Sequence, residues 1–222
     1  MKILAMADLH GYLPNIDVHI ADIDVVVISG DIAPAFSPYY QTEWLNNEFR
    51  EWVTKLNKTV FGCYGNHDYG SFENDSTVQL HANEIIGKFF LFSWTKEFFG
   101  WNYMVKDLDT DPPANKLRGS IESRLAGKLL GNIDKTPEIW VCHGPPYGIC
   151  DNSLGSVALY NAIETYKPKA VFVGHIHDGY RVGQIGASQI YNCSLVDNAL
   201  NLIHKPIIIE LSKGKAVEVR LL

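Results

Sequence analysis

The apolar run Thr59 to Tyr64 (TVFGCY) leads directly into Gly65-Asn66-His67-Asp68 (GNHD), and this stretch decides the fold. A short apolar run that ends at a glycine is typical of a buried β-strand. The amide, the imidazole and the carboxylate that follow would lie at the end of that strand, where solvent and ligands reach the edge of a sheet. The tetrapeptide alone is weak evidence, but similar segments occur elsewhere in the chain.

Four further apolar runs end in the same kind of polar segment. They lead into Asp8-Leu9-His10-Gly11, Gly30-Asp31, His143-Gly144 and Gly174-His175-Ile176-His177. In open α/β sheets, ligands bind outside the carboxyl ends of the strands. We therefore expect the ends of five strands to meet and to form one polar cluster.

The size and charge of the chain limit what kind of protein it can be. A chain of 222 residues can form one well-buried core, and we expect a single domain that spans residues 1–222. The formal net charge of −6 gives no basic surface, so we expect no extended nucleic acid as a partner. The sequence also shows neither a membrane span nor a signal peptide, and we expect a cytoplasmic protein.

The cysteines indicate neither a disulfide framework nor a zinc cluster. They form no Cys-x-x-Cys pair and are widely spaced, at Cys63, Cys142, Cys150 and Cys193. Cys63 and Cys142 fall within apolar runs, where a small buried thiol is the expected interpretation.

The first part of the chain alternates between strands and helices. Apolar residues from Thr42 to Leu56 recur at spacings of three and four, which predicts an amphipathic helix. A second helix is expected from about 114 to 130. A third helix is expected to begin after a capping serine, Ser153 or Ser156, and to end near Tyr166.

Other segments predict strands or remain open. Leu80 to Trp94 predicts a strand pair that is broken near Gly87-Lys88. The aromatic-rich segment 95–113 has two open interpretations, a loop over the active site or an edge that packs on the core. The C-terminal part predicts a β-meander of four short strands, Tyr180–Ile185, Ser188–Cys193, Ile207–Leu211 and Ala216–Leu221.

Together the five strand ends supply carboxylate, amide and imidazole groups without sulfur. These groups belong to Asp8, His10, Asp31, Asn66, His67, His143, His175 and His177. This ligand set suits Mn²⁺, Fe²⁺, Zn²⁺, Co²⁺ or Ni²⁺, whereas the histidines argue against a plain Mg²⁺ or Ca²⁺ site. Because the ligands are too many for one catalytic ion, we expect two ions that share a carboxylate.

The five segments, in this order, resemble the calcineurin-like metallophosphoesterases. That family carries Asp-x-His, Gly-Asp, Gly-Asn-His-Asp/Glu, His and Gly-His-x-His, and all five occur here between residues 8 and 177. The resemblance implies an α/β fold, a four-layer αββα sandwich of two mixed β-sheets flanked by helices. His143-Gly144-Pro145-Pro146 also resembles small bacterial-type, phosphodiesterase-like members of the family.

The resemblance further implies a set of ligands for two divalent metal ions. They are Asp8, His10 and His177 for one ion, Asn66, His143 and His175 for the other, and Asp31 as the bridge. We expect Mn²⁺ or Fe²⁺ first, with Zn²⁺, Ni²⁺ and Co²⁺ as alternatives.

The expected chemistry follows from the charge of such a site. Two divalent ions, two aspartates and a bridging hydroxide leave a charge of about +1, which favours a phosphate ester, and we expect the metal-bridging hydroxide to attack phosphorus in line. His67 lies outside the ligand set, so we expect it to act as a general acid or to donate to a phosphoryl oxygen. The expected catalytic residues are His67, Asp31 and Asn66. Asp68 has two open interpretations, since it either orients His67 or only closes a turn.

The sequence around Gly30-Asp31 narrows the range of expected substrates. It lacks the Asp-Arg pair of protein serine/threonine phosphatases, and Pro34 stands where purple acid phosphatases carry a metal-binding tyrosine. A monoester dianion usually attracts an arginine fork, but only Arg181 lies near one of the five segments, so a diester is slightly favoured. The residues expected to bind the substrate are Asn66, His67, Tyr12, Tyr69 and Arg181.

We therefore expect a metal-dependent phosphodiesterase that acts on a small diester such as a cyclic nucleotide. A broad phosphomonoesterase and a non-catalytic interaction scaffold of the same fold are the alternatives. The intact His67 and the complete ligand set argue against the scaffold. The sequence does not define the natural substrate, the native metal pair or the oligomeric state.

Overall fold

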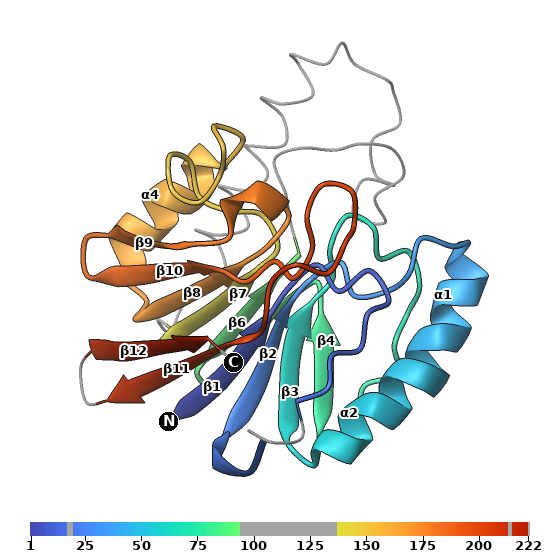
Figure 1. Cartoon of the computed structure of the whole chain (residues 1–222). Coiled ribbons are helices and arrows are strands. Elements are labelled where there is room, and N and C mark those ends of the chain that lie inside the picture. Colours follow the sequence, from blue (N-terminus) through green and yellow to red (C-terminus); the bar gives the residue numbers. More distant parts are fainter. Residues whose placement is uncertain (17–19, 94–136, 213–214, 222) are drawn as a thin grey trace.

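The computed structural model describes residues 1–16, 20–93, 137–212 and 215–221 (Figure 1). These residues form two six-stranded mixed sheets, with the strand orders β12-β11-β1-β2-β3-β4 and β5-β6-β7-β8-β10-β9. The first sheet contains β1 (Lys2–Met6), β2 (Val25–Ser29), β3 (Thr59–Cys63), β4 (Val78–His81), β11 (Ile207–Ser212) and β12 (Lys215–Leu221). The second contains β5 (Asn83–Ile86), β6 (Phe89–Phe92), β7 (Ile139–Cys142), β8 (Ala170–Val173), β9 (Val182–Ile185) and β10 (Ser188–Asn192).

The helix expected from Thr42 to Leu56 is present but begins earlier. It consists of α1 (Pro38–Trp44), a π-helical segment η2 (Leu45–Phe49) and α2 (Arg50–Leu56). The Ser37 hydroxyl caps the start by accepting a hydrogen bond from Tyr40 N, and Pro38 is the first helical residue. The helix ends at Asn57, which has the left-handed φ of 51°.

The other described helices are short. α4 spans Val157–Tyr166, and the Ser156 hydroxyl caps it by accepting a hydrogen bond from Leu159 N, as one of the two sequence interpretations predicts. Two 3₁₀ turns, η1 (Ile20–Asp22) and η4 (His177–Gly179), complete the described helical segments. None of the helices in the described ranges combines the length and the apolar character that a membrane span requires.

Burial on both faces explains why the central strands are almost wholly apolar. In β1, Ile3 and Ala5 point toward the second sheet, whereas Leu4 and Met6 point toward the outer face, and all four are fully buried. Strands of parallel sheets that are covered on both faces show this continuous apolar pattern. β1, β2, β3 and β4 are indeed parallel neighbours.

Three apolar clusters define the four layers. One fills the space between the two sheets, one lies between the first sheet and α1 to α2, and one lies between the second sheet and α4. Figure 1 shows α4 beside one sheet and α1 and α2 beside the other. The αββα sandwich implied by the resemblance is therefore confirmed.

Two details of the predicted strands differ from the structure. The last four strands form no single meander, because β9 and β10 pair in the second sheet while β11 and β12 pair in the first. The strand pair expected from Leu80 to Trp94 is the hairpin β5–β6, with its turn at Gly87-Lys88, but β4 belongs to the other sheet. The segment 95–113 and the helix expected at 114–130 lie outside the described residues.

Candidate metal centre

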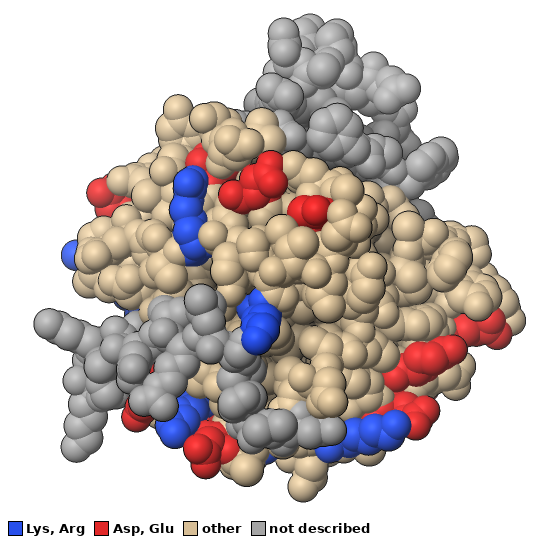
Figure 2. Space-filling view, in the orientation of Figure 1, with Lys and Arg blue, Asp and Glu red and all other residues tan. Residues whose placement is uncertain are grey.

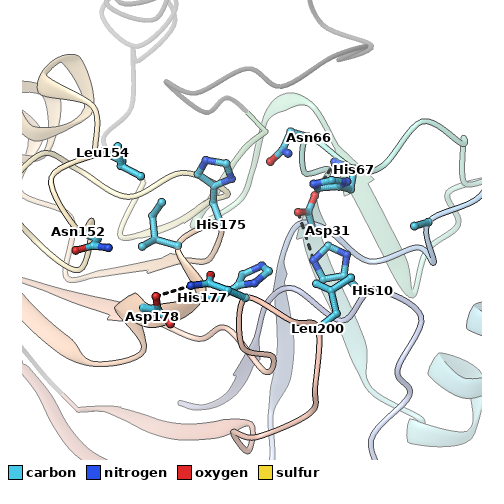
Figure 3. A pocket seen from close by; sticks show the side chains of 13 residues that line it. His10, Asp31, Asn66, His67, Asn152, Leu154, His175, His177, Asp178 and Leu200 are labelled. Atoms are coloured by element: carbon cyan, nitrogen blue, oxygen red, sulfur yellow. Dashed lines mark hydrogen bonds and ion pairs between the residues drawn. The ribbon is translucent and has the colours of Figure 1, made fainter.

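The carboxyl ends of β1, β2 and β3 lie opposite those of β7 and β8, so the five polar segments surround one cleft. β1 to β3 are parallel neighbours in the first sheet, and β7 and β8 are parallel neighbours in the second. Figure 3 shows that side chains from both sheets point into the same space. The predicted convergence of five strand ends is confirmed.

Two overlapping groups of ligand atoms lie within this cleft. One atom from each of Asp8, His10 and His177 lies within 4.8 Å of the other two, and so do atoms of Asp8, Asp31 and His143. Asp8 belongs to both groups, which are called the first and the second ligand group below. Asp31 also approaches the first group, since its Oδ2 lies 3.7 Å from His10 Nε2. Either carboxylate is therefore placed between the two groups.

The other two predicted ligands lie beside the second ligand group. Asn66 Oδ1 lies 2.9 Å from His143 Nε2, so both atoms face the same point. The ring of His175 contacts the ring of His143 edge-on, with 5.2 Å between their centroids. The structure thus brings all seven predicted ligands together.

His10 gives the clearest sign that a metal ion fits here. Its side chain is only 4% exposed, and neither ring nitrogen has a hydrogen-bond partner. A buried imidazole without a hydrogen-bond partner is unfavourable, and native proteins rarely keep one without a reason. A metal ion bound by His10, Asp8 and His177 would supply the missing partner.

Backbone carbonyls fix the orientation of two of the histidines. His143 Nδ1 lies 2.7 Å from Ser29 O, and His177 Nδ1 lies 2.9 Å from Asp197 O. A proton held on Nδ1 leaves Nε2 as the ligand atom, and such outer contacts are typical of metal-binding histidines. The Nε2 atoms of these two residues are the ones that approach Asp31 and Asp8.

The charges of the cleft are strongly coupled. Burial acts to lower the pKa of His143, but Asp31 and Asp8 raise it to about 9. Burial acts to raise the pKa of Asp31, yet His143, His10 and His67 hold it well below its usual range. In the metal-free protein, the imidazolium of His143 therefore balances part of the charge of the two aspartates.

Two other histidines are held in the neutral form that binds metal. Burial lowers the pKa of His175 to about 3, and the nearby His143 contributes to this effect. Burial also lowers the pKa of His10, although Asp31 and Asp8 act in the opposite direction. Both rings are therefore neutral near pH 7, as ligands must be.

Close backbone approach explains two of the glycines in the polar segments. A Cβ on Gly65 would overlap with the backbone and the carboxylate of Asp31. A Cβ on Gly174 would lie 2.7 Å from Asp8 Oδ2. These two glycines allow the loops from different strands to come close enough for the aspartates to share one site.

Asp68 is part of the frame of the site, and no hydrogen bond between its carboxylate and the His67 side chain is present. It accepts hydrogen bonds from the backbone N–H groups of Ile32, Ala33 and Gly65, at 2.8 to 3.1 Å. These bonds tie the Gly30-Asp31 loop to the Gly65-Asn66-His67-Asp68 turn. Of the two open interpretations, the structure therefore favours the closing of a turn.

His67 lies beside the ligand groups without belonging to either. Its ring contacts that of His10 edge-on, with 5.4 Å between centroids, and its backbone N–H donates to Asp31 Oδ1 at 2.8 Å. The side chain points into the cleft (Figure 3). It is therefore placed to contact a substrate while leaving the ligand atoms free.

The cleft has a volume of about 460 Å³ and extends beyond the ligands. Sequence reasoning missed several lining residues, namely Ala35, Asn152, Leu154, Ile176, Asp178, Asn198 and Leu200. Asp178 directly follows the Gly-His-x-His segment and was the easiest to infer. Asn198 and Leu200 follow no recognisable segment, so only the folded chain brings them to the cleft.

Three predicted substrate-binding residues are absent from the described cleft wall. Tyr12, Tyr69 and Arg181 do not line the cleft. Tyr69 directly follows Asp68, and burial together with the charges of Asp31 and Asp68 raises the pKa of its phenol. Binding of substrate by these three residues stays a prediction.

Comparison with known proteins agrees with this geometry. Residues 1–179 match the family described as calcineurin-like phosphoesterase. Metallophosphoesterase domain-containing protein 1 of Homo sapiens is 29% identical over 147 residues, which cover 62% of this chain and 38% of that protein. The Mus musculus protein of the same name gives the same values. The chain thus spans less than half the length of these relatives.

The fold is also found among solved structures. One crystal structure superposes with a TM-score of 0.67 at 16% identity, and the match covers 99% of this chain and 98% of the other. At this identity, the likeness supports the shared fold alone. The match over residues 1–179 includes all five polar segments, and on this evidence the chain belongs to the calcineurin-like phosphoesterase family.

Proposed function

We propose that this protein is a metal-dependent phosphodiesterase that uses two divalent ions, with Mn²⁺ or Fe²⁺ as the first candidates. The observation that carries the proposal is the pair of overlapping ligand groups, between which both Asp8 and Asp31 lie. Catalytic two-metal sites hold their ions about 3.5–4 Å apart, and ligand groups as close as these suit such a pair. The ligand set is rich in imidazole and lacks sulfur, which suits these ions better than Mg²⁺ or Ca²⁺.

Each residue of the centre has a role in this mechanism. The first ion would be held by Asp8, His10 and His177, and the second by Asn66, His143 and His175, with Asp31 next to both. When bound, the ions would supply a nucleophile from water near neutral pH and would stabilise charge on the phosphoryl oxygens. His67 lies beside these ligands, and it would donate a proton or a hydrogen bond to a substrate oxygen.

The charges of the cleft favour a diester over a monoester. Among the described residues, no lysine or arginine lines the cleft. A monoester dianion would lack the arginine fork that usually binds it, whereas a diester carries a single negative charge. The basic and acidic side chains on the face seen in Figure 2 are scattered. This distribution suits a small phosphodiester better than an extended nucleic acid.

Metal-resolved hydrolysis would test the proposal. The protein is stripped with a chelator, single divalent ions are added back, and the hydrolysis of bis-p-nitrophenyl phosphate and of p-nitrophenyl phosphate is compared. We expect Mn²⁺ or Fe²⁺ to restore hydrolysis, with higher kcat/KM for the diester. A higher value for the monoester would indicate a phosphomonoesterase instead. Binding of metal without hydrolysis of either ester would contradict an enzymatic function.

A further inference from the structure

The cleft has a second wall that holds no metal ligand. This wall is formed by Asn152, Leu154, Ile176, Asp178, Asn198 and Leu200, and is called the outer wall below. In Figure 3, Asn152, Leu154 and Asp178 lie across the view from Asn66, His67 and Asp31, whereas Leu200 lies beside His10. A phosphate ester at the ligand groups would place one of its substituents against this wall, because the two walls share one cleft.

Three segments form the outer wall: the loop with Asn152 and Leu154, the turn with Asn198 and Leu200, and the start of η4 with Ile176 and Asp178. In the first two, an aspartate accepts backbone hydrogen bonds. Asp151 Oδ2 accepts hydrogen bonds from Gly148 N at 2.8 Å and from Gly155 N at 3.0 Å, and this closes the loop that carries Asn152 and Leu154. This loop is therefore formed before any ligand arrives, which limits the entropy that binding loses.

The second loop is equally well defined. Asp197 Oδ1 accepts hydrogen bonds from Ala199 N at 2.9 Å and from Asn201 N at 2.8 Å. Within this turn Leu200 has a left-handed φ of 61°. A leucine rarely adopts this conformation, and such strain concentrates at ligand-binding sites. The turn thereby places an apolar side chain in the cleft.

The outer wall carries negative charge and apolar surface. Its charged side chain is Asp178, and among the described lining residues neither lysine nor arginine accompanies it. The amide of Asn198 donates a hydrogen bond to Asp178 Oδ2, which fixes the carboxylate at the edge of the cleft (Figure 3). Leu154, Ile176 and Leu200 provide apolar surface in the same cleft. The Asp178 carboxylate would repel an anionic substituent. A cation on a short carbon chain would be attracted by the carboxylate, and its carbon atoms would contact the apolar side chains.

We propose that the outer wall binds the second ester group of the substrate and favours a positively charged alkyl group, such as a quaternary or primary ammonium, through Asp178. This inference rests on the proposed phosphodiesterase function. Asp178 is exposed, so the attraction acts through water and its effect is modest. We expect a preference of about three- to fivefold over an uncharged group of the same shape, as exposed charge pairs give.

Two diesters with the same leaving group would test the outer wall. They are p-nitrophenyl phosphorylcholine and p-nitrophenyl 3,3-dimethylbutyl phosphate, in which carbon replaces the choline nitrogen. We expect kcat/KM of the metal-loaded protein to be about three- to fivefold higher for the choline ester at low salt. Asp178→Asn should bring the ratio to about one, and so should about 0.5 M salt. Asp22→Asn, which changes an exposed carboxylate at the other end of the sheet, should keep the wild-type ratio.

A binding measurement separates this inference from the proposed function. Titration calorimetry of the metal-loaded protein with phosphocholine and with 3,3-dimethylbutyl phosphate requires no turnover. We expect phosphocholine to bind about three- to fivefold more tightly than 3,3-dimethylbutyl phosphate, and we expect Asp178→Asn to remove this preference. Equal affinities in the wild type, or a preference that survives Asp178→Asn, would overturn the outer-wall inference. Failure to hydrolyse any ester, with the binding preference intact, would instead overturn the proposed function alone.

Discussion

Asp68 holds the metal centre together from outside the ligand set, and its replacement by asparagine is the most informative single change. The carboxylate is 3% exposed and uses both oxygens. Oδ1 accepts from Ile32 N at 2.9 Å and from Ala33 N at 2.8 Å, while Oδ2 accepts from Gly65 N at 2.8 Å. The two loops that it joins carry Asp31 and Asn66.

The expected magnitude follows from these hydrogen bonds. An asparagine at position 68 has one oxygen and one NH₂ group, so in either orientation the NH₂ group faces a backbone N–H donor. At least one buried N–H then lacks an acceptor, which costs about 1–3 kcal/mol, and the remaining hydrogen bonds are made to a neutral oxygen instead of a charged one. We expect Asp68→Asn to lower the free energy of unfolding of the metal-loaded protein by about 2–4 kcal/mol. For a chain of this size, this corresponds to a fall in Tm of roughly 4–16 °C.

The metal-free protein should be less sensitive to the same substitution. Burial and the charge of Asp31 raise the pKa of Asp68 when no ion offsets that charge. A raised carboxyl pKa means that the folded state binds the proton more tightly than the unfolded state. The metal-free wild type should therefore gain stability from Asp68 as the pH falls from about 7 toward about 4, and Asp68→Asn should lack this gain.

Thermal unfolding with and without Mn²⁺, together with a metal titration, would measure these effects. Asp151→Asn is the matched control, because Asp151 is also 3% exposed and accepts two backbone N–H groups. Both of those bonds end on one oxygen, which an asparagine retains. We expect the control to lose about 1 kcal/mol or less and to bind metal as the wild type does.

One pattern of results would refute this reasoning. If Asp68→Asn and Asp151→Asn were equally stable, and both bound Mn²⁺ with wild-type affinity, the hydrogen bonds of Asp68 would not hold the centre. Loss of stability without loss of metal affinity would show that the hydrogen bonds of Asp68 stabilise the fold but do not position the metal ligands.

Two further predictions concern the histidines. His67→Ala should keep the full metal content, by elemental analysis, while kcat for bis-p-nitrophenyl phosphate falls by about 10²- to 10⁴-fold, and loss of metal would show that His67 is a ligand. The pKa of about 9 for His143 means that metal binding displaces a proton. The affinity for Mn²⁺ should therefore rise about tenfold per pH unit between about pH 6 and 8. Binding heats that do not depend on the buffer would contradict this.

The positions of the ligands could be predicted from the sequence because each belongs to a strand end. The apolar run that precedes His143 predicts a buried strand, and His143 follows it at once. A residue in that position is carried to the edge of the sheet whatever its neighbours are. Asn66 and His175 likewise follow the ends of β3 and β8 by only a few residues.

Which sheet a strand joins could not be predicted in the same way. β4 and β5 are separated by the single residue Ala82, yet they belong to different sheets. The apolar pattern specifies burial, and both sheets bury their strands equally. The pairing of β11 with β1 was missed for the same reason, since it depends on contacts across almost the whole chain.

The outer wall shows a second reason why part of the site could not be predicted from the sequence. Asn198 and Leu200 line the cleft because Asp197 organises a turn, and the same residue accepts a hydrogen bond from His177 through its carbonyl. A single turn thus orients a metal ligand and shapes the substrate side of the cleft. A loop of this kind has no periodic pattern, so its contribution is visible only in three dimensions.

The backbone of the ligands connects the fold to the chemistry. Asp8, His10, Asp31 and His175 all have left-handed φ values, between 44° and 66°. L-residues avoid this region, at a cost of roughly 1–2 kcal/mol each, and they keep it only where the surroundings fix it. The surroundings here are hydrogen bonds between the polar segments, such as the one from His175 N to Asp8. The four residues lie in the loops that directly follow β1, β2 and β8. The centre is therefore formed by the fold itself, and it includes His10, whose ring nitrogens have no hydrogen-bond partner among the described residues.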